Sequence, residues 1–153
     1  MRKPSPTMTL MTDQASPLPS ALATALDRVG DRWSLLLVEA LLTAPRRFNE
    51  LSEAVPGIAP NILSDRLRRL ERAGVVVATP YSRKPVRMEY SLTPDGHELA
   101  GALRLLADWG ARGGGVGEPL RHDACGTPLE ARWHCPTCNR TVDDGDAIEL
   151  TRL

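Results

Sequence analysis

The sequence lacks the features that would place it in a membrane or point to catalysis. No apolar run in its 153 residues approaches the roughly 20 residues needed to cross a bilayer. Asp13 and three prolines, Pro4, Pro6 and Pro17, interrupt the N-terminal stretch, so it has no signal-peptide hydrophobic segment, and we expect a cytoplasmic protein. A glycine-rich phosphate loop, paired carboxylates and a Ser-His-Asp arrangement are also missing. These absences argue against an enzyme.

The chain also lacks a net charge, because it has 19 basic and 19 acidic residues. Taken alone, this balance would argue against a protein that binds a polyanion. The charges are unevenly distributed, however. Residues 45–91 contain nine basic and five acidic side chains and carry +4, whereas the rest of the chain carries −4. An uneven distribution of charge is better evidence about binding partners than the net charge of the whole chain. It makes residues 45–91 the candidate nucleic-acid surface.

The length allows one ordinary domain and a small appendage. An apolar share of 42% and a charged share of 25% are typical of a globular protein. Residues 1–18 are rich in Pro, Ser, Thr and Met and predict a flexible arm. Three consecutive glycines open a predicted linker over 113–120, which separates a domain over 19–112 from a tail over 121–153.

Apolar periodicity and capping residues predict five helices in the domain. Gly30 ends the first helix, Asp31 caps the second, and Pro45 closes it. Pro60 suits the first position of the fourth helix, and Gly74 follows its end. The predicted helices cover about 21–29, 33–42, 49–54, 60–73 and 93–112.

The helix over 60–73 has two different faces. Its leucines recur at helical spacing and predict a buried stripe, while polar residues repeat the same spacing on the other side. A short helix and a tight turn precede it, so the pair describes a helix-turn-helix unit. The buried stripe consists of Leu63, Leu67 and Leu70, and the polar face of Asn61, Asp65, Arg68 and Arg72.

Two β-prone runs, 75–79 and 87–92, follow this helix and predict a hairpin. Residues 80–85 separate them and carry two adjacent cations, Arg83 and Lys84, at the tip. The fold class is therefore α+β and mainly α: a winged helix-turn-helix domain followed by a small tail.

The basic helix and hairpin suit double-stranded DNA. A B-form major groove admits an α-helix, and base edges meet side chains in the N-terminal half of that helix. The alternative is a solvated surface, which nine basic residues on one motif disfavour. Asp65 is unfavourable near phosphates unless it accepts from cytosine N4 or pairs with Arg68 or Arg69. The predicted base-reading residues are Asn61, Ser64, Asp65 and Arg68; the other predicted DNA-binding residues are Arg46, Arg47, Arg66, Arg69, Arg72, Arg83, Lys84 and Arg87.

Four segments carry a resemblance to a known family. They are 25–36, 46–51, 56–58 with 60–67, and 86–96, which closely resemble the HxlR-type winged helix-turn-helix transcription regulators of bacteria and occur in that family's order and spacing. The resemblance covers roughly residues 19–112. It implies a homodimer built from the first and last helices, a pseudo-palindromic operator, and regulation by occlusion of polymerase, with repression the commoner outcome.

The chain departs from the family pattern at two positions. Many members carry a Cys-Pro pair at the start of the first helix, and in several that thiol senses oxidants. Ser20-Ala21 stands there in this sequence, which excludes thiol sensing at that site. Ala59 occupies the position where a hydroxyl residue commonly caps the recognition helix, which forfeits about 1 kcal/mol.

All three cysteines lie in the tail, in two short motifs. His122 and Cys125 form an H-x2-C pair, and Cys135 and Cys138 form a C-x2-C pair nine residues later. Two such pairs are the arrangement that a tetrahedral, structural Zn²⁺ requires. The tail is therefore predicted to be a small acidic zinc ribbon with short strands over 130–133 and 147–151. His134 is a competing fourth ligand.

Other interpretations of the tail and the domain stay open. The cysteines could form a redox pair or a disulfide, or could be uncoordinated thiols. Trp33, Tyr90 and Trp109 are candidates to line a small-molecule effector cavity between dimer helices, although aromatic residues at helical spacing more often belong to the core. A winged-helix module that docks a protein, with the zinc ribbon as its functional surface, is the alternative to a DNA-binding regulator.

Overall fold

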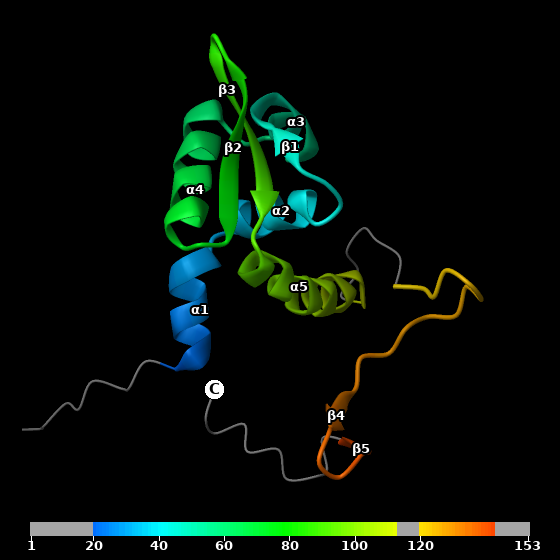
Figure 1. Cartoon of the computed structure of the whole chain (residues 1–153). Coiled ribbons are helices and arrows are strands. Elements are labelled where there is room, and N and C mark those ends of the chain that lie inside the picture. Colours follow the sequence, from blue (N-terminus) through cyan, green and yellow to red (C-terminus); the bar gives the residue numbers. More distant parts are fainter. Residues whose placement is uncertain (1–19, 113–119, 143–153) are drawn as a thin grey trace, which may run out of the picture.

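The computed structural model describes residues 20–112 and 120–142 (Figure 1). The predicted arm over 1–18 and the linker residues 113–119 lie outside this part of the chain. The elements in chain order are α1 (Ala21–Val29), α2 (Arg32–Leu41), β1 (Arg46–Arg47), α3 (Phe48–Ala54), α4 (Pro60–Arg72), β2 (Val76–Arg83), β3 (Val86–Leu92), α5 (Pro94–Arg112), β4 (Trp133–Cys135) and β5 (Arg140–Val142).

The helices of the domain begin and end where the capping residues predict. Asp31 accepts hydrogen bonds from the backbone N–H groups of Trp33 and Ser34, both at 3.1 Å, and so caps α2. Ala59 makes no side-chain cap at α4, as predicted. Gly74 follows α4 with φ of +72°, a left-handed conformation that glycine adopts without strain.

The core lies between α2, α4 and the base of the sheet. Leu37, Val38 and Leu41 of α2 are buried against the leucine stripe of α4, whose three members are at most 1% exposed. The predicted stripe is therefore confirmed. Burial of three full leucine side chains contributes several kcal/mol to folding and fixes which face of α4 points outward.

A three-stranded antiparallel sheet in the order β1-β3-β2 forms the wing. The sequence pattern did not predict β1, whose two arginines pair with Tyr90 and Glu89 of β3. The predicted hairpin is confirmed, but its strands run further, to Arg83 and from Val86. Pro80 fits within β2 because β2 is an edge strand, where a missing N–H costs no ladder bond on the free side.

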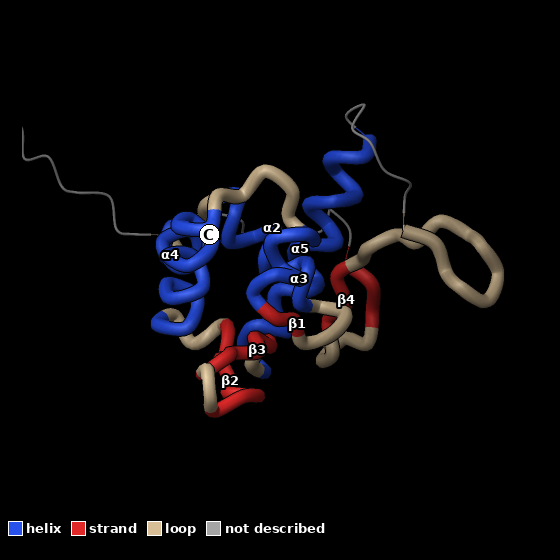
Figure 2. Tube along the Cα trace, turned by 90° about the horizontal axis from the view of Figure 1, so that it is seen from above, coloured by secondary structure: helices blue, strands red, loops and turns tan. Residues whose placement is uncertain are grey.

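The arrangement places α4 along one side of the wing and α3 along the other. Figure 1 shows α4 beside β2, with β1 and α3 on the opposite side, and Figure 2 shows the same order from above. A register shift between Pro80 and Ser82 leaves Tyr81 without a ladder partner, and this bulge lies on the α3 side of the sheet.

α5 is fastened to the sheet by its first turn. Thr93 Oγ1 accepts a hydrogen bond from the Gly96 N–H at 3.1 Å and donates one to the Gly74 carbonyl at 2.6 Å. A Cβ at Gly96 would clash with the Val75 carbonyl oxygen, so only glycine allows this approach. In the described ranges, no helix has both the length and the apolar character needed to cross a membrane.

The described part of the tail forms one hairpin and one turn. β4 and β5 pair so that Cys135 lies opposite Arg140. The strand predicted over 130–133 is wrong, since the hairpin begins only at Trp133 and is centred on the C-x2-C turn. The second predicted strand, over 147–151, lies outside the described residues.

Candidate nucleic-acid interface

The outward face of α4 carries the polar residues that the periodicity predicts. Asn61, Asp65, Arg68 and Arg72 are all exposed, and Ser64 beside them is half-buried. Helical spacing lines these side chains up on one side of a helix whose other side is anchored in the core. The result is a rigid helix that presents a continuous polar and mostly basic face.

Asp31, the N-cap of α2, and Arg66, in the middle of α4, join the two helices. Arg66 Nε lies 3.0 Å from Asp31 Oδ1, at an angle that makes the contact an ion pair rather than a hydrogen bond. Arg66 also pairs with Asp65 at 2.8 Å, so one guanidinium contacts two carboxylates. The cationic partner of the Asp65 carboxylate is therefore Arg66, and not Arg68 or Arg69, the two arginines that helical spacing predicted.

The pKa of Asp31 reflects this junction. Partial burial raises this pKa. The hydrogen bonds from the Ser34 side chain and backbone, the positive charge of Arg66 and the hydrogen bond from the Trp33 N–H together outweigh burial, so the pKa of Asp31 lies below its ordinary value. The Ser34 hydroxyl donates to Asp31 Oδ2 at 2.5 Å. Asp31 is therefore held ionised where it meets Arg66.

Two further predicted DNA-binding arginines contact the protein itself. Arg69 donates from Nη2 to the Asp27 carbonyl at 2.5 Å, which links α4 to α1. Arg46 donates from Nε to the carbonyl of Ala40, in the last turn of α2, at 2.7 Å. Their roles toward DNA stay predictions, and the structure adds that both help to position α4 and β1.

The remaining predicted cations lie on the wing and at its base. Arg83 and Lys84 are exposed at the hairpin tip, and Arg87 is exposed on β3. Arg47, at the N-cap of α3, stacks its guanidinium on the Tyr81 ring, with 4.3 Å from Cζ to the ring centroid. The sequence pattern does not single out Tyr81, because the contact depends on the bulge in β2.

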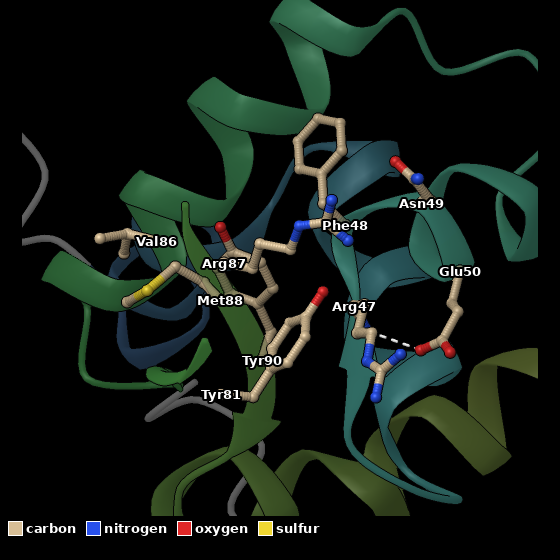
Figure 3. Close-up of a pocket in the computed structure, with 9 residues that line it drawn as sticks. All are labelled: Arg47, Phe48, Asn49, Glu50, Tyr81, Val86, Arg87, Met88 and Tyr90. Atoms are coloured by element: carbon tan, nitrogen blue, oxygen red, sulfur yellow. Dashed lines mark hydrogen bonds between the residues drawn. The ribbon is translucent and has the colours of Figure 1, made fainter. Parts of the chain in front are cut away.

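Arg47, Arg87 and Tyr81 line a hollow of about 570 Å³ between the wing and α3. Figure 3 shows Arg47 and Tyr81 facing one another and the Arg87 side chain reaching from β3 toward Phe48 of α3. Glu50 is also at its edge, where its carboxylate accepts a hydrogen bond from the Arg47 backbone N–H at 2.6 Å. The other lining residues are Asn49, Val86, Met88 and Tyr90.

A polar recognition helix, a cationic wing tip and this order of elements are those of a winged helix-turn-helix protein. The sequence pattern of the HxlR-like helix-turn-helix family matches residues 28–115, more than half of the chain. The chain belongs to this family. It is a DNA-binding transcriptional regulator of the helix-turn-helix type and not an enzyme.

Similar proteins agree with the assignment of this HxlR-like chain. An uncharacterized HTH-type transcriptional regulator of Mycobacterium tuberculosis is 38% identical over 122 residues, which cover 77% of each chain. The reduced form of the redox regulator HypR superimposes with a TM-score of 0.58 at 32% identity, over 61% of this chain and 92% of its own. A MarR-family transcriptional regulator from Enterococcus faecalis superimposes with a TM-score of 0.54 at 33% identity, over 71% of this chain and 94% of its own.

The start of α1 differs chemically from a thiol sensor in this HxlR-like chain. Ser20 is the N-cap of α1, and its Oγ accepts a hydrogen bond from the Ala23 N–H at 3.0 Å. This serine has a structural role in starting the helix.

Of the aromatic residues considered for an effector cavity, Trp33 and Tyr90 pack against the core, whereas Trp109 is 69% exposed on α5.

The predicted metal ligands of the tail lie in two turns of similar form. His122 Nδ1 is 3.3 Å from Cys125 Sγ, and the next residue, Gly126, has φ of +70°. In the second turn Cys138 is likewise followed by a left-handed residue, Asn139, with φ of 51°. An antiparallel bridge flanks each turn, between residues 121 and 128 and between residues 135 and 140.

The two turns differ in one respect from a closed metal site. Within residues 120–142 each turn brings its own two ligands together, but no three of the potential ligands form one cluster. Hydrogen bonds from the Thr127 side chain and backbone lower the pKa of Cys125, and hydrogen bonds from the backbone and thiol of Cys138 lower that of Cys135. Both shifts favour the thiolate, which is the form that binds metal.

Proposed function

We propose that this HxlR-like regulator binds a pseudo-palindromic operator as a homodimer, acts as a repressor, and carries a structural zinc ion in its tail. The observation that carries the DNA part is the exposed face of α4, flanked by a wing whose tip holds two exposed cations. A helix in the major groove reads bases through its N-terminal half, and a wing reaches the flanking minor groove or its phosphates.

Base reading falls to residues on the outward face of α4. Asn61 and Arg68 have side chains that make bidentate contacts with adenine and guanine, respectively. Asp65 and the half-buried Ser64 lie between them along the helix, on the same face. Arg72 at the last turn, with Arg47 at the base of the wing and Arg87 near its tip, suits phosphate contacts that set register without reading sequence.

Apolar surface on α1 and α5 supports the homodimer. Leu22 and Leu26 on α1 are 56% and 50% exposed, and Leu106 and Trp109 on α5 are 51% and 69% exposed. Large apolar side chains clustered on the surface of a small domain mark an interface. Leu105 is exposed on the same helix, whereas Leu99 and Leu103 pack against the core.

The same helices would fix the spacing of the two recognition helices. Arg28 of α1 donates to the Ala73 carbonyl at the end of α4 at 2.8 Å and pairs with Asp95 of α5. Together with the contact from Arg69 to Asp27, this connects each α4 to the proposed interface. Two-fold symmetry then predicts half-sites about one helical turn apart.

Zinc in the tail follows from the ligand chemistry. Two turns that each present two ligands to one side supply the four donors of a closed tetrahedral site, which leaves no open position for catalysis. A ribbon of this size has too little core to fold alone, so metal binding would supply its stability. The two turns would then close on one ion. His134 lies in β4, paired with Thr141, and stays the alternative fourth ligand.

Selection of bound duplexes from a random library tests the DNA part of the proposal. We expect the selected duplex to bind at least 10³-fold more tightly than a mixed-sequence duplex at the same salt concentration. Arg68→Gln should reduce this preference, whereas Arg112→Gln, which removes a charge from the last turn of α5, should leave it unchanged. Equal affinity for both duplexes would contradict sequence-specific binding.

A further inference from the structure

The hollow between the wing and α3 has the chemistry of a site for a phosphodiester backbone. Arg47 and Arg87 approach it from β1 and from β3, and Glu50 is its one lining carboxylate. Because two cations face one anion that is already engaged with a backbone N–H, the hollow is positive. Its volume, about 570 Å³, exceeds that of a phosphate group and admits a sugar as well.

Arg47 is held in one position by its neighbours. Its backbone pairs with Glu89 of β3 in β1, and its N–H is bonded to Glu50. Its guanidinium lies over the face of the Tyr81 ring, with 4.3 Å from Cζ to the ring centroid. Among described residues, no carboxylate lies within ion-pair distance of this guanidinium.

The bulge in β2 is what brings Tyr81 to Arg47. Thr79 and Pro80 pair with Glu89 and Met88, and Ser82 pairs with Arg87, so Tyr81 is the extra residue between two regular pairs. A bulge of this kind redirects a side chain and locally increases strand twist. In this wing it places the tyrosine ring on the α3 side, 42% exposed, against the cation.

We infer that this hollow seats the DNA backbone strand that borders the minor groove under the wing, and that Tyr81 is a positioning residue which holds Arg47 toward a phosphate. This inference rests on the proposed function. α4 and α3 flank the wing on opposite sides (Figure 1), so a duplex that takes α4 in its major groove would meet this hollow where its backbone crosses the wing toward α3. The exposed apolar residue Val86 at the same hollow suits contact with deoxyribose.

Salt titration on a mixed-sequence duplex of about 30 base pairs tests the inference, since phosphate contacts do not depend on sequence. Each contact contributes about 0.9 to the slope of log affinity against log salt concentration. Arg47→Gln should therefore lower the slope by about 1.8 for a dimer. Arg112→Gln is the control of equal charge and should leave the slope within about 0.3 of wild type.

Tyrosine variants separate positioning from direct contact. Tyr81→Leu removes the ring and should weaken binding by about 5- to 25-fold for a dimer, whereas Tyr81→Phe keeps the ring and should stay within about twofold. In the Arg47→Gln background, Tyr81→Leu should have no further effect if it acts through Arg47. Additive losses would overturn the positioning role.

Two failures are distinguishable. If wild-type protein shows no salt-dependent binding to any duplex, the proposed function itself fails. If wild type binds with a steep salt slope but Arg47→Gln and Tyr81→Leu both retain that slope and affinity, DNA binding stands and the backbone site in the hollow is refuted. Thermal unfolding midpoints of the variants close to wild type would show that the losses do not arise from misfolding.

Discussion

Replacement of Asp31 by asparagine tests whether the ion pair between α2 and α4 helps to hold the recognition helix. Asparagine caps helices about as well as aspartate, so the change keeps the bonds to the Trp33 and Ser34 N–H groups and removes the charge that faces Arg66. Both side chains of the pair are only 24% exposed. The loss should therefore reach the upper end of what exposed pairs contribute, about 1 kcal/mol.

The pH dependence of this loss has a definite sign. The folded-state pKa of Asp31 lies below its ordinary value of 3.8, so the ionised form contributes stability above that pH, and the contribution disappears as pH falls through the folded-state pKa. The difference in the free energy of unfolding between wild type and Asp31→Asn should reach its maximum, about 1 kcal/mol, at pH 6 to 7. It should shrink below about pH 4.

Thermal unfolding followed by circular dichroism, at one protein concentration, measures the effect. About 1 kcal/mol corresponds to a midpoint lower by roughly 4 °C for a domain of this size. Asp65→Asn is the matched control, because Asp65 contacts the same guanidinium at 2.8 Å but is 59% exposed; its cost should stay below about 0.5 kcal/mol. Equal losses for the two variants, or a difference for Asp31→Asn that is undiminished at pH 3, would refute the reasoning.

Three other predictions address the tail, the dimer and the wing. Metal analysis should find about one zinc ion per chain, lost in Cys135→Ser; a metal-free protein with a native tail would contradict the ribbon. Trp109→Glu should convert a dimer to a monomer in sedimentation, while Val86→Glu, at a side chain of similar exposure on the wing, should leave the dimer intact. A Trp109→Glu variant that is still a dimer would show that Trp109 is not part of the interface. Arg83→Ala should lower the salt slope of DNA binding by about one per protomer, with Arg112→Gln as control.

Local signals were enough to predict the helices. Gly30 and Asp31 separate α1 from α2, Pro60 starts α4, and Gly74 follows its end. Capping residues and proline favour the start of a helix, and glycine favours the position after its end. The outward face of α4 followed from helical periodicity alone. The family resemblance was confirmed by the match to the HxlR-like pattern.

The features that the sequence did not reveal depend on distant partners. β1 is two arginines long, and its pairing with β3 spans more than forty residues, so no local run announces it. The Arg66 contact with Asp31 and the bulge at Tyr81 likewise arise from tertiary packing. In the tail, the strand expected over 130–133 was misplaced because the C-x2-C turn, not the apolar pattern, sets where the hairpin pairs.

The central claim is that α4 reads base sequence, and repeating the selection from a random duplex library with Asn61→Ala tests it most directly. Loss of one bidentate base contact should relax the preference at one position in each half-site by about 1–3 kcal/mol and leave the other positions intact. The wild-type sites should be two-fold symmetric, with half-sites about one helical turn apart. Identical selected sequences for wild type and Asn61→Ala would contradict the assignment of Asn61 as a base-reading residue, and the absence of any enriched sequence would contradict sequence reading by α4 altogether.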